Sequence, residues 1–287
     1  MESNLTSVSV IRKKLKQHQV YPSKKLGQNF LVDGNILDKI VDAVDPSKSD
    51  LVIEIGAGLG TLTKALAQRA GHVVTVEKDR RIIPLLEENL EGFSNITIVG
   101  EDILKLPISD LVLPGADYDI IKAVGNLPYY VTSPIIMHLL GARVELANIT
   151  CMVQREVALR MIAKPNTKEY GVLSVAVQAK SRPELVCYVP RTVFYPKPEV
   201  DSAVIRLVPG GLSFPTDTHE EYFFRVVKAA FGQRRKIISN ALRAGLGMSA
   251  ERISQVLVQA AIDPNCRGET LSPEEFYQIA QVLLEET

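Results

Sequence analysis

Val52-Ile53-Glu54-Ile55-Gly56-Ala57-Gly58-Leu59-Gly60-Thr61-Leu62 is the stretch that decides the fold. An apolar run leads directly into a glycine-rich turn, and a helix-compatible sequence follows. Glycines let a backbone adopt positive φ and approach a ligand closely. The N-terminus of the helix that follows adds a favourable dipole. The stretch therefore predicts a strand, a ligand-binding turn and a helix.

The turn departs from the dinucleotide-binding pattern. That pattern, G-x-G-x-x-G, would require a glycine at position 61, where the chain has Thr61. The chain instead has E-x-G-x-G-x-G from Glu54 to Gly60. A carboxylate at the strand end suits a positively charged, amine-bearing ligand better than a pyrophosphate. We therefore expect Glu54, Gly56 and Gly58 to contact a nucleoside-containing cofactor.

Two further predicted strands are followed by carboxylates. Residues 72–76 precede Glu77, which comes about twenty residues after the first glycine, where nucleoside-binding α/β folds bind ribose hydroxyls. Residues 96–99 precede Asp102, which we expect to meet an adenine amino group. Each acid alone is explained equally well as a helix N-cap or a solvated loop charge. The ordered series, which ends at Asn126, favours a cofactor site.

The tetrapeptide Asn126-Leu127-Pro128-Tyr129 follows the next predicted strand and suits chemistry on an aromatic amine. The Asn126 amide oxygen and the Leu127 carbonyl can accept hydrogen bonds from the two hydrogens of an exocyclic NH2 group. These bonds localise the nitrogen lone pair, which is otherwise delocalised into the ring. Pro128 fixes its own φ, so that Tyr129 is aimed as a flat stacking surface. No strong general base is needed.

Two longer motifs complete the pattern: Lys25-Leu26-Gly27-Gln28-Asn29-Phe30-Leu31 and Phe194-Tyr195-Pro196-Lys197-Pro198-Glu199-Val200-Asp201-Ser202. With the turn and the tetrapeptide, they resemble the ribosomal RNA adenine N6,N6-dimethyltransferases, which use S-adenosylmethionine to modify small-subunit rRNA. The resemblance runs from Lys24 to about Arg243, without a departure from the family pattern at these motifs. The two long motifs are more specific than the turn, which many methyltransferases share.

The resemblance implies roles for several residues to which general chemistry alone assigns none. It places Gln28, Asn29 and Leu31 at the cofactor, although a linker or N-cap would otherwise be the default reading of this segment. It places Lys24 and Lys25 near RNA. It implies that Phe194 stacks on the target base opposite Tyr129, since a base must leave its helix or loop to be methylated. For Tyr195, a packing role under the sheet is equally compatible.

The alternation of strand-like and helical runs predicts an α/β fold with a parallel sheet, followed by a stretch that is helical throughout. The resemblance implies that the sheet is a Rossmann-like, S-adenosylmethionine-dependent methyltransferase sheet and that the helical stretch is a small C-terminal all-α domain. We expect a catalytic domain with a basic N-terminal extension over 1–208, a linker rich in Pro and Gly, and a helical RNA-contacting domain over 212–287. Residues 171–178 are ambiguous, and 183–189 with 202–208 are expected to form an antiparallel pair. The expected strands are 51–55, 73–77, 96–99, 119–124 and 149–153; the expected helices are 34–44, 60–70, 80–91, 132–141, 154–163, 218–231, 234–244, 249–259 and 273–285.

Composition and charge distribution limit the kinds of partner that the chain can bind. The formal net charge is zero, but basic residues gather in two places. One is the N-terminal stretch with Lys24 and Lys25, and the other contains Arg234, Arg235 and Lys236. We expect phosphate contacts there, although ordinary solvated helix faces would look the same. No apolar run suggests a membrane span, and the scattered Cys and His residues suggest neither a disulfide framework nor a metal site.

We therefore expect a cytoplasmic, monomeric enzyme that methylates small-subunit rRNA within an immature ribosomal subunit. A transit peptide stays an alternative, since the first twenty residues contain Ser, Thr and basic residues. Three functional alternatives stay open. They are a large-subunit rRNA adenine methylase of the antibiotic-resistance type, a DNA or protein-glutamine methylase with a similar tetrapeptide, and a ribosome-assembly or transcription factor on a methylase fold.

Overall fold

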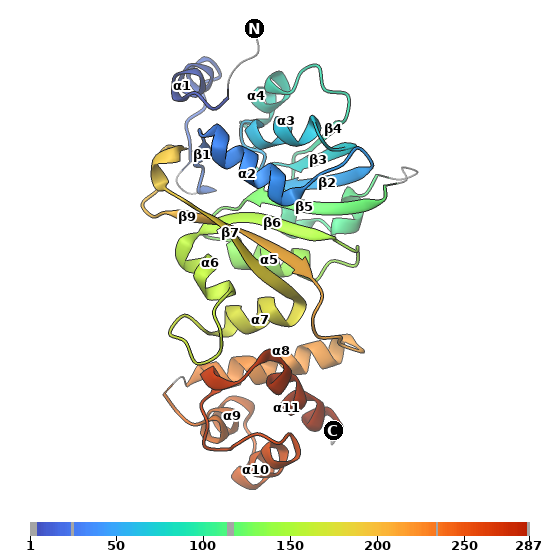
Figure 1. The fold of residues 1–287 in the computed structure, drawn as a ribbon, viewed down its shortest axis with the longest axis vertical. Coiled ribbons are helices and arrows are strands. Elements are labelled where there is room, and N and C mark those ends of the chain that lie inside the picture. The colour runs from blue at the N-terminus through green and yellow to red at the C-terminus, as the bar shows by residue number, and fades with distance from the viewer. Residues whose placement is uncertain (1–4, 24–25, 114–117, 234, 286–287) are drawn as a thin grey trace. The chain divides into compact units, whose positions relative to one another are not determined.

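The computed structural model describes residues 5–23, 26–113, 118–233 and 235–285. The chain divides into two compact units (Figure 1): unit 1 is Met1–Ala158 with Glu184–Pro209, and unit 2 is Leu159–Pro183 with Gly210–Thr287. The sequence analysis instead expected one break near the linker, with domains over 1–208 and 212–287. Residues 159–183 join the C-terminal helices because Tyr170 and Val175 are buried in the same apolar cluster as Phe223 and Phe276.

Unit 1 is built on a seven-stranded sheet with the order β4-β3-β2-β5-β6-β9-β7. The strands from β4 to β6 pair in parallel, and β9 pairs antiparallel with β6. The α/β fold with a parallel sheet is therefore confirmed, as are the five predicted strands. The strands are β2 (Asp50–Ile55), β3 (His72–Val76), β4 (Ile96–Val99), β5 (Ile120–Asn126), β6 (Asn148–Gln154), β7 (Ser181–Val189) and β9 (Ser202–Pro209).

The helices of unit 1 lie against this sheet. Every residue of β2 is buried, as expected of a parallel strand covered on both faces. On one face, Val52, Val73 and Val124 share an apolar cluster with Ile40 of α2 and Leu66 of α3. The helices are α1 (Val8–Gln17), α2 (Gly34–Val44), α3 (Thr61–Ala67), α4 (Ile83–Asn89), α5 (Thr132–Leu140) and α6 (Arg155–Met161), with 3-10 turns η2 (Ile103–Lys105), η3 (Ile108–Leu111) and η4 (Arg191–Val193).

A small second sheet joins the two long motifs, which the sequence analysis treated separately. Strand β1 (Phe30–Leu31) pairs antiparallel with β8 (Phe194–Tyr195), and Leu31 lies opposite Phe194. Helix α1 buries Ile11 and Leu15 in a cluster with Phe30. The N-terminal extension is thus packed on the end of the first motif.

Unit 2 contains the ambiguous segment and the C-terminal helices. Residues 172–178 of the ambiguous segment are helical, within α7, and Gly171 is the N-cap of that helix. The predicted start of the 234–244 helix is wrong, because α9 begins at Ile238, whose N–H donates to the Cys266 carbonyl at 2.7 Å. This tertiary bond places Arg235 and Lys236 in the turn before α9. The helices are α7 (Val172–Lys180), α8 (Asp217–Gly232), α9 (Ile238–Leu246), α10 (Ala250–Gln259) and α11 (Pro273–Glu285), with the 3-10 turn η5 (Gly268–Thr270). Among the described residues, no helix is both long and apolar enough to cross a membrane.

Candidate functional site

Two adjoining pockets open at the carboxyl ends of the parallel strands of unit 1. The larger has a volume of about 790 Å³ and the smaller about 450 Å³, with the open mouth included in each. The two pockets share five lining residues: Asn29, Phe30, Gly56, Gly58 and Asn126.

The predicted cofactor residues all line one or both pockets. Gln28, Glu77 and Asp102 line the larger pocket, and Leu31 and Glu54 line the smaller. The other four are among the shared residues. They meet because β4, β3, β2 and β5 are consecutive in the sheet and parallel, so that their carboxyl ends share one edge. Their contact with a cofactor stays a prediction.

At the glycine turn, Gly56 and Gly58 line both pockets with backbone atoms. Gly56 has φ +80° and Gly58 has φ +55°, so both adopt the left-handed region that favours glycine. A Cβ added at Gly58 would lie 3.3 Å from the Phe30 ring, which is tight. Glycine at this position therefore allows the turn and the end of the first motif to approach each other.

Glu77 is buried and holds the turn in place. One carboxylate oxygen, Oε2, accepts the Gly58 N–H at 2.8 Å, and Oε1 accepts the Asp79 N–H at 2.8 Å. Burial raises the pKa of Glu77 above its ordinary value, while these two bonds act in the opposite direction. Each carboxylate oxygen has a second lone pair, so the group can still accept from ligand hydroxyls.

Glu54 lies deeper, with 1% of its surface exposed. Its Oε2 accepts hydrogen bonds from the hydroxyls of Thr63 at 2.5 Å and Thr75 at 2.7 Å. Burial raises the pKa of Glu54 to about 7, above its ordinary value of 4.5. A positive ligand group in the smaller pocket would favour the ionised form.

Asp102 has partners within the protein. Its Oδ2 pairs with the Lys78 ammonium at 2.6 Å, and its Oδ1 accepts the Leu104 N–H at 3.2 Å as the N-cap of η2. The Lys78 hydrogen bond holds the pKa of Asp102 below its ordinary value. The N-cap alternative is therefore correct for Asp102, which also lines the larger pocket beside Ile103 and Leu104.

The tetrapeptide presents one oxygen to the pockets. The Asn126 side-chain nitrogen donates to the Asn29 carbonyl at 3.0 Å, which assigns the amide oxygen Oδ1 to the other side. Leu127 is buried, and its N–H donates to the Met152 carbonyl at 3.1 Å. Pro128 lines the larger pocket. No described residue donates a hydrogen bond to the amide oxygen, which can therefore accept one from a ligand.

Neither of the two predicted stacking residues is among the described residues that line the two pockets. The Tyr129 hydroxyl is 2.8 Å from the Ser202 hydroxyl, and burial raises the pKa of Tyr129. Phe194 is only 4% exposed and packs in the cluster that contains Leu31 and Met152, both of which line the smaller pocket. Stacking of Phe194 on a base stays a prediction.

Only some of the residues predicted to contact RNA lie in the described part of the chain. Lys24, Lys25 and Arg234 lie outside the described residues. Arg235 and Lys236 are exposed in unit 2.

In the parts of the chain that are described, no group of three or more His, Cys, Asp or Glu residues could hold a metal ion.

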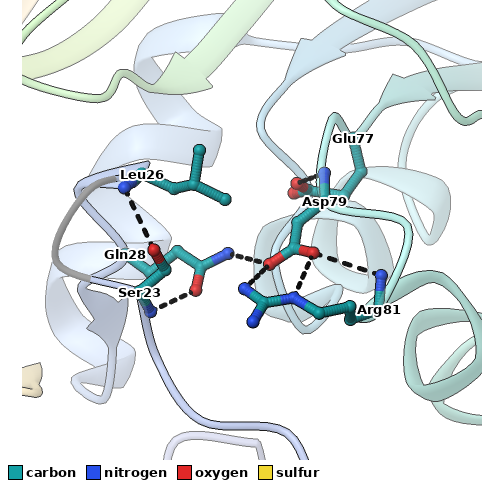
Figure 2. Close-up of polar contacts among 6 residues, drawn as sticks. All are labelled: Ser23, Leu26, Gln28, Glu77, Asp79 and Arg81. Atoms are coloured by element: carbon teal, nitrogen blue, oxygen red, sulfur yellow. Dashed lines mark hydrogen bonds and ion pairs between the residues drawn. The ribbon is translucent and has the colours of Figure 1, made fainter.

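Sequence reasoning missed a network beside the larger pocket (Figure 2). Asp79 receives hydrogen bonds from Gln28 and from the Arg81 side chain and backbone. Lys78 and the exposed Tyr130 also line the pocket. The run Glu77-Lys78-Asp79-Arg80-Arg81 holds two acids followed by two arginines, and this pattern could have indicated a local ion pair.

Comparisons with known proteins find relatives that match nearly the whole chain. The curated "Ribosomal RNA small subunit methyltransferase A" of Pelotomaculum thermopropionicum is 47% identical over 98% of each chain. That of Streptococcus pneumoniae is 43% identical over 97% of this chain and 98% of its own.

Solved structures show the same fold. A dimethyladenosine transferase from Plasmodium falciparum has a TM-score of 0.76 and 28% identity, over 89% of this chain and 96% of its own. The 23S rRNA methyltransferase ErmE has a TM-score of 0.66 and 28% identity, over 89% of this chain and 99% of its own. The predicted Rossmann-like methyltransferase fold is therefore confirmed. The sequence model for ribosomal RNA adenine dimethylases matches residues 22–285, and the chain belongs to this family.

Proposed function

We propose that the chain transfers methyl groups from S-adenosylmethionine to N6 of two adjacent adenosines near the 3′ end of small-subunit (16S-type) rRNA, giving N6,N6-dimethyladenosines. The observation that carries the proposal is the orientation of Asn126. Its amide nitrogen is held by the Asn29 carbonyl, and it lies in the wall that the two pockets share. One pocket can then hold a methyl donor beside an acceptor for an amine.

The donor set of the pockets fits S-adenosylmethionine. The Glu77 carboxylate suits the ribose hydroxyls, and Asp102 with its apolar neighbours Ile103 and Leu104 suits an adenine ring and its amino group. The Glu54 carboxylate suits the positive charge of the amino-acid end. Gly56 and Gly58 allow the ligand to lie against bare backbone.

S-adenosylmethionine held by these residues would supply a methyl group on a sulfonium sulfur for transfer to the adenosine N6, and N6 would release its proton to solvent. The Asn126 oxygen and the Leu127 carbonyl accept hydrogen bonds from the amine and localise its lone pair. By the resemblance to the family, Tyr129 and Phe194 would stack on the base, although neither is among the residues that line the two pockets. Positioning supplies most of the rate, since the chain needs no covalent intermediate.

RNA is recognised by basic residues outside the pockets. In unit 1, Arg12, Lys13 and Lys16 are exposed on α1, and the Arg12 guanidinium lies 4.9 Å from the centre of the Tyr195 ring. In unit 2, Arg235 and Lys236 are exposed. Such contacts give salt-dependent binding to phosphates. We infer that the substrate is rRNA within an immature small subunit and that the enzyme acts in the cytoplasm as a monomer.

The test is methylation of small ribosomal subunits that lack dimethyladenosine, with isotopically labelled S-adenosylmethionine. Nucleosides from the digested rRNA are separated by mass spectrometry, and fragments locate the modified positions. We expect labelled N6,N6-dimethyladenosine at two adjacent positions near the 3′ end, and none with Asn126→Ala over the same period.

Two outcomes would overturn the proposal. Label in large-subunit rRNA and not in small subunits would favour a methylase of the antibiotic-resistance type. Tight binding to immature small subunits without any label would favour an assembly factor on a methylase fold.

A further inference from the structure

Gln28 connects two parts of unit 1 through its side-chain amide. Its oxygen accepts the Ser23 N–H at 2.7 Å, and its nitrogen donates to Asp79 Oδ2 at 2.8 Å (Figure 2). Because both ends of the amide have protein partners, Gln28 is suited to holding the pocket wall in place as well as to contacting a ligand. Its position depends on Asp79.

Asp79 is buried, with 6% of its surface exposed, and both oxygens of its carboxylate accept hydrogen bonds. The Arg81 side chain donates through Nε to Oδ1 at 2.9 Å and through a terminal nitrogen to Oδ2 at 2.7 Å. The Arg81 hydrogen bond holds the pKa of Asp79 below its ordinary value. At neutral pH the group is therefore an ionised acceptor for the Gln28 amide.

The backbone of Asp79 reaches the cofactor side of the site. Its N–H donates to Glu77 Oε1 at 2.8 Å, and Glu77 Oε2 accepts the Gly58 N–H. The ribose-binding carboxylate and the glycine turn are thus connected directly to the loop that carries Asp79.

The side chain of Asp79 reaches the amine side of the site. It holds Gln28, and the next residue, Asn29, accepts the Asn126 side-chain N–H through its carbonyl at 3.0 Å. A shift of Gln28 would therefore move the carbonyl that orients Asn126. Misplacement of a reacting group by about 1 Å can lower a rate by about two orders of magnitude.

We propose that Asp79 is a positioning residue that couples the cofactor pocket to the Asn126 amide by holding Gln28 and the loop after Glu77. It touches neither reacting group. The inference rests on the proposed function, because it assigns Asn126 to the chemical step.

The experiment compares Asp79→Asn, Gln28→Met and the double variant. Asparagine places an amide NH2 against the donors of Gln28 or Arg81, while methionine removes the polar end of Gln28. We expect each single variant to lower kcat at saturating cofactor by about tenfold or more, and Asp79→Asn also to raise the S-adenosylmethionine Kd several-fold. The double variant should lower kcat no further than the worse single one.

Asp50→Asn is the matched control. Asp50 is also buried and ionised, pairs with Lys122 at 2.8 Å and accepts the Ser47 N–H, but it lies at the opposite end of the strands. This variant should lower the thermal unfolding midpoint and leave kcat and Kd near wild type. All assays are run well below the lowest midpoint.

Three results would count against the inference. If Asp79→Asn keeps kcat and Kd within about twofold of wild type, Asp79 has no positioning role. If the losses in the double variant multiply, Asp79 does not act through Gln28. A wild-type chain that binds no S-adenosylmethionine in calorimetry would overturn the proposed function itself, and the inference with it.

Discussion

The Asn126 side-chain nitrogen donates a hydrogen bond to the Asn29 backbone carbonyl at 3.0 Å, across a separation of 97 residues. The bond decides which face of the amide meets a ligand, because an amide has its donor and acceptor on opposite branches. It also makes the position of Asn29, directly before β1 of the small sheet, matter for the amide at the end of β5.

Asn126→Ala should lower the single-turnover methylation rate by about two or more orders of magnitude, with a smaller effect on cofactor affinity. The reason is that the amide oxygen accepts from the amine most strongly as the nitrogen becomes pyramidal. Rapid-quench assays at saturating substrates measure the rate. A near wild-type rate would remove Asn126 from the chemical step, and RNA binding by Asn126→Ala should be unchanged.

Glu77→Gln should weaken S-adenosylmethionine binding by about 1–3 kcal/mol, since a charged acceptor is lost. The amide can no longer accept from both Gly58 and Asp79 without turning a donor toward one of them. Isothermal calorimetry measures the affinity. Glu91→Gln, an exposed carboxylate in the same unit, is the control; equal affinities for the two variants would place the ribose elsewhere.

Tyr129→Phe and Ser202→Ala each remove one partner of the 2.8 Å hydroxyl pair. If this bond aims the Tyr129 ring, each variant should reduce kcat by an amount equivalent to about 0.5–1.5 kcal/mol. The double variant should match the single ones, because the same bond is lost. Fully additive losses in the kinetic double-mutant cycle would show that the hydroxyl pair does not position the ring.

Glu54 should make stability depend on pH. Burial raises its folded-state pKa from 4.5 to about 7, so its stabilising contribution is complete below the ordinary pKa and is lost as pH rises through the folded value. Between about pH 5 and pH 8, the unfolding free energy of wild type should fall relative to Glu54→Gln by about 2–3 kcal/mol. Glutamine still accepts from Thr63 and Thr75 but does not titrate. Urea unfolding of both proteins across this range tests the prediction; parallel curves would contradict it.

Arg235→Glu with Lys236→Glu should weaken association with immature small subunits, most strongly at low salt, where phosphate contacts contribute most. Filter binding over a salt series gives the slope of affinity against salt, which should become shallower. Lys39→Glu, at an exposed position on α2, is the control for a change in overall charge. Unchanged binding at every salt concentration would exclude this turn as a phosphate contact.

The sequence by itself determined the order of the five parallel strands of unit 1 and of the helices between them. The alternation of apolar runs and glycine turns is local, and the ends of parallel strands share one edge, so Glu54, Glu77, Asp102 and Asn126 could be grouped before any coordinates were known. The start of α9 could not be read in this way, because a bond from Ile238 to the distant Cys266 carbonyl sets it.

Tertiary structure alone decided how the site residues are held. Residues 159–183 joined the C-terminal helices because side-chain burial follows contacts in space, which local periodicity does not report. The pairing of Leu31 with Phe194 and the bonds from Gln28 to Asp79 and from Asn126 to Asn29 join residues distant in sequence. Residue type and spacing give the chemistry available to a chain, whereas the direction of a hydrogen bond between two distant side chains exists only once the sheet and its loops have assembled.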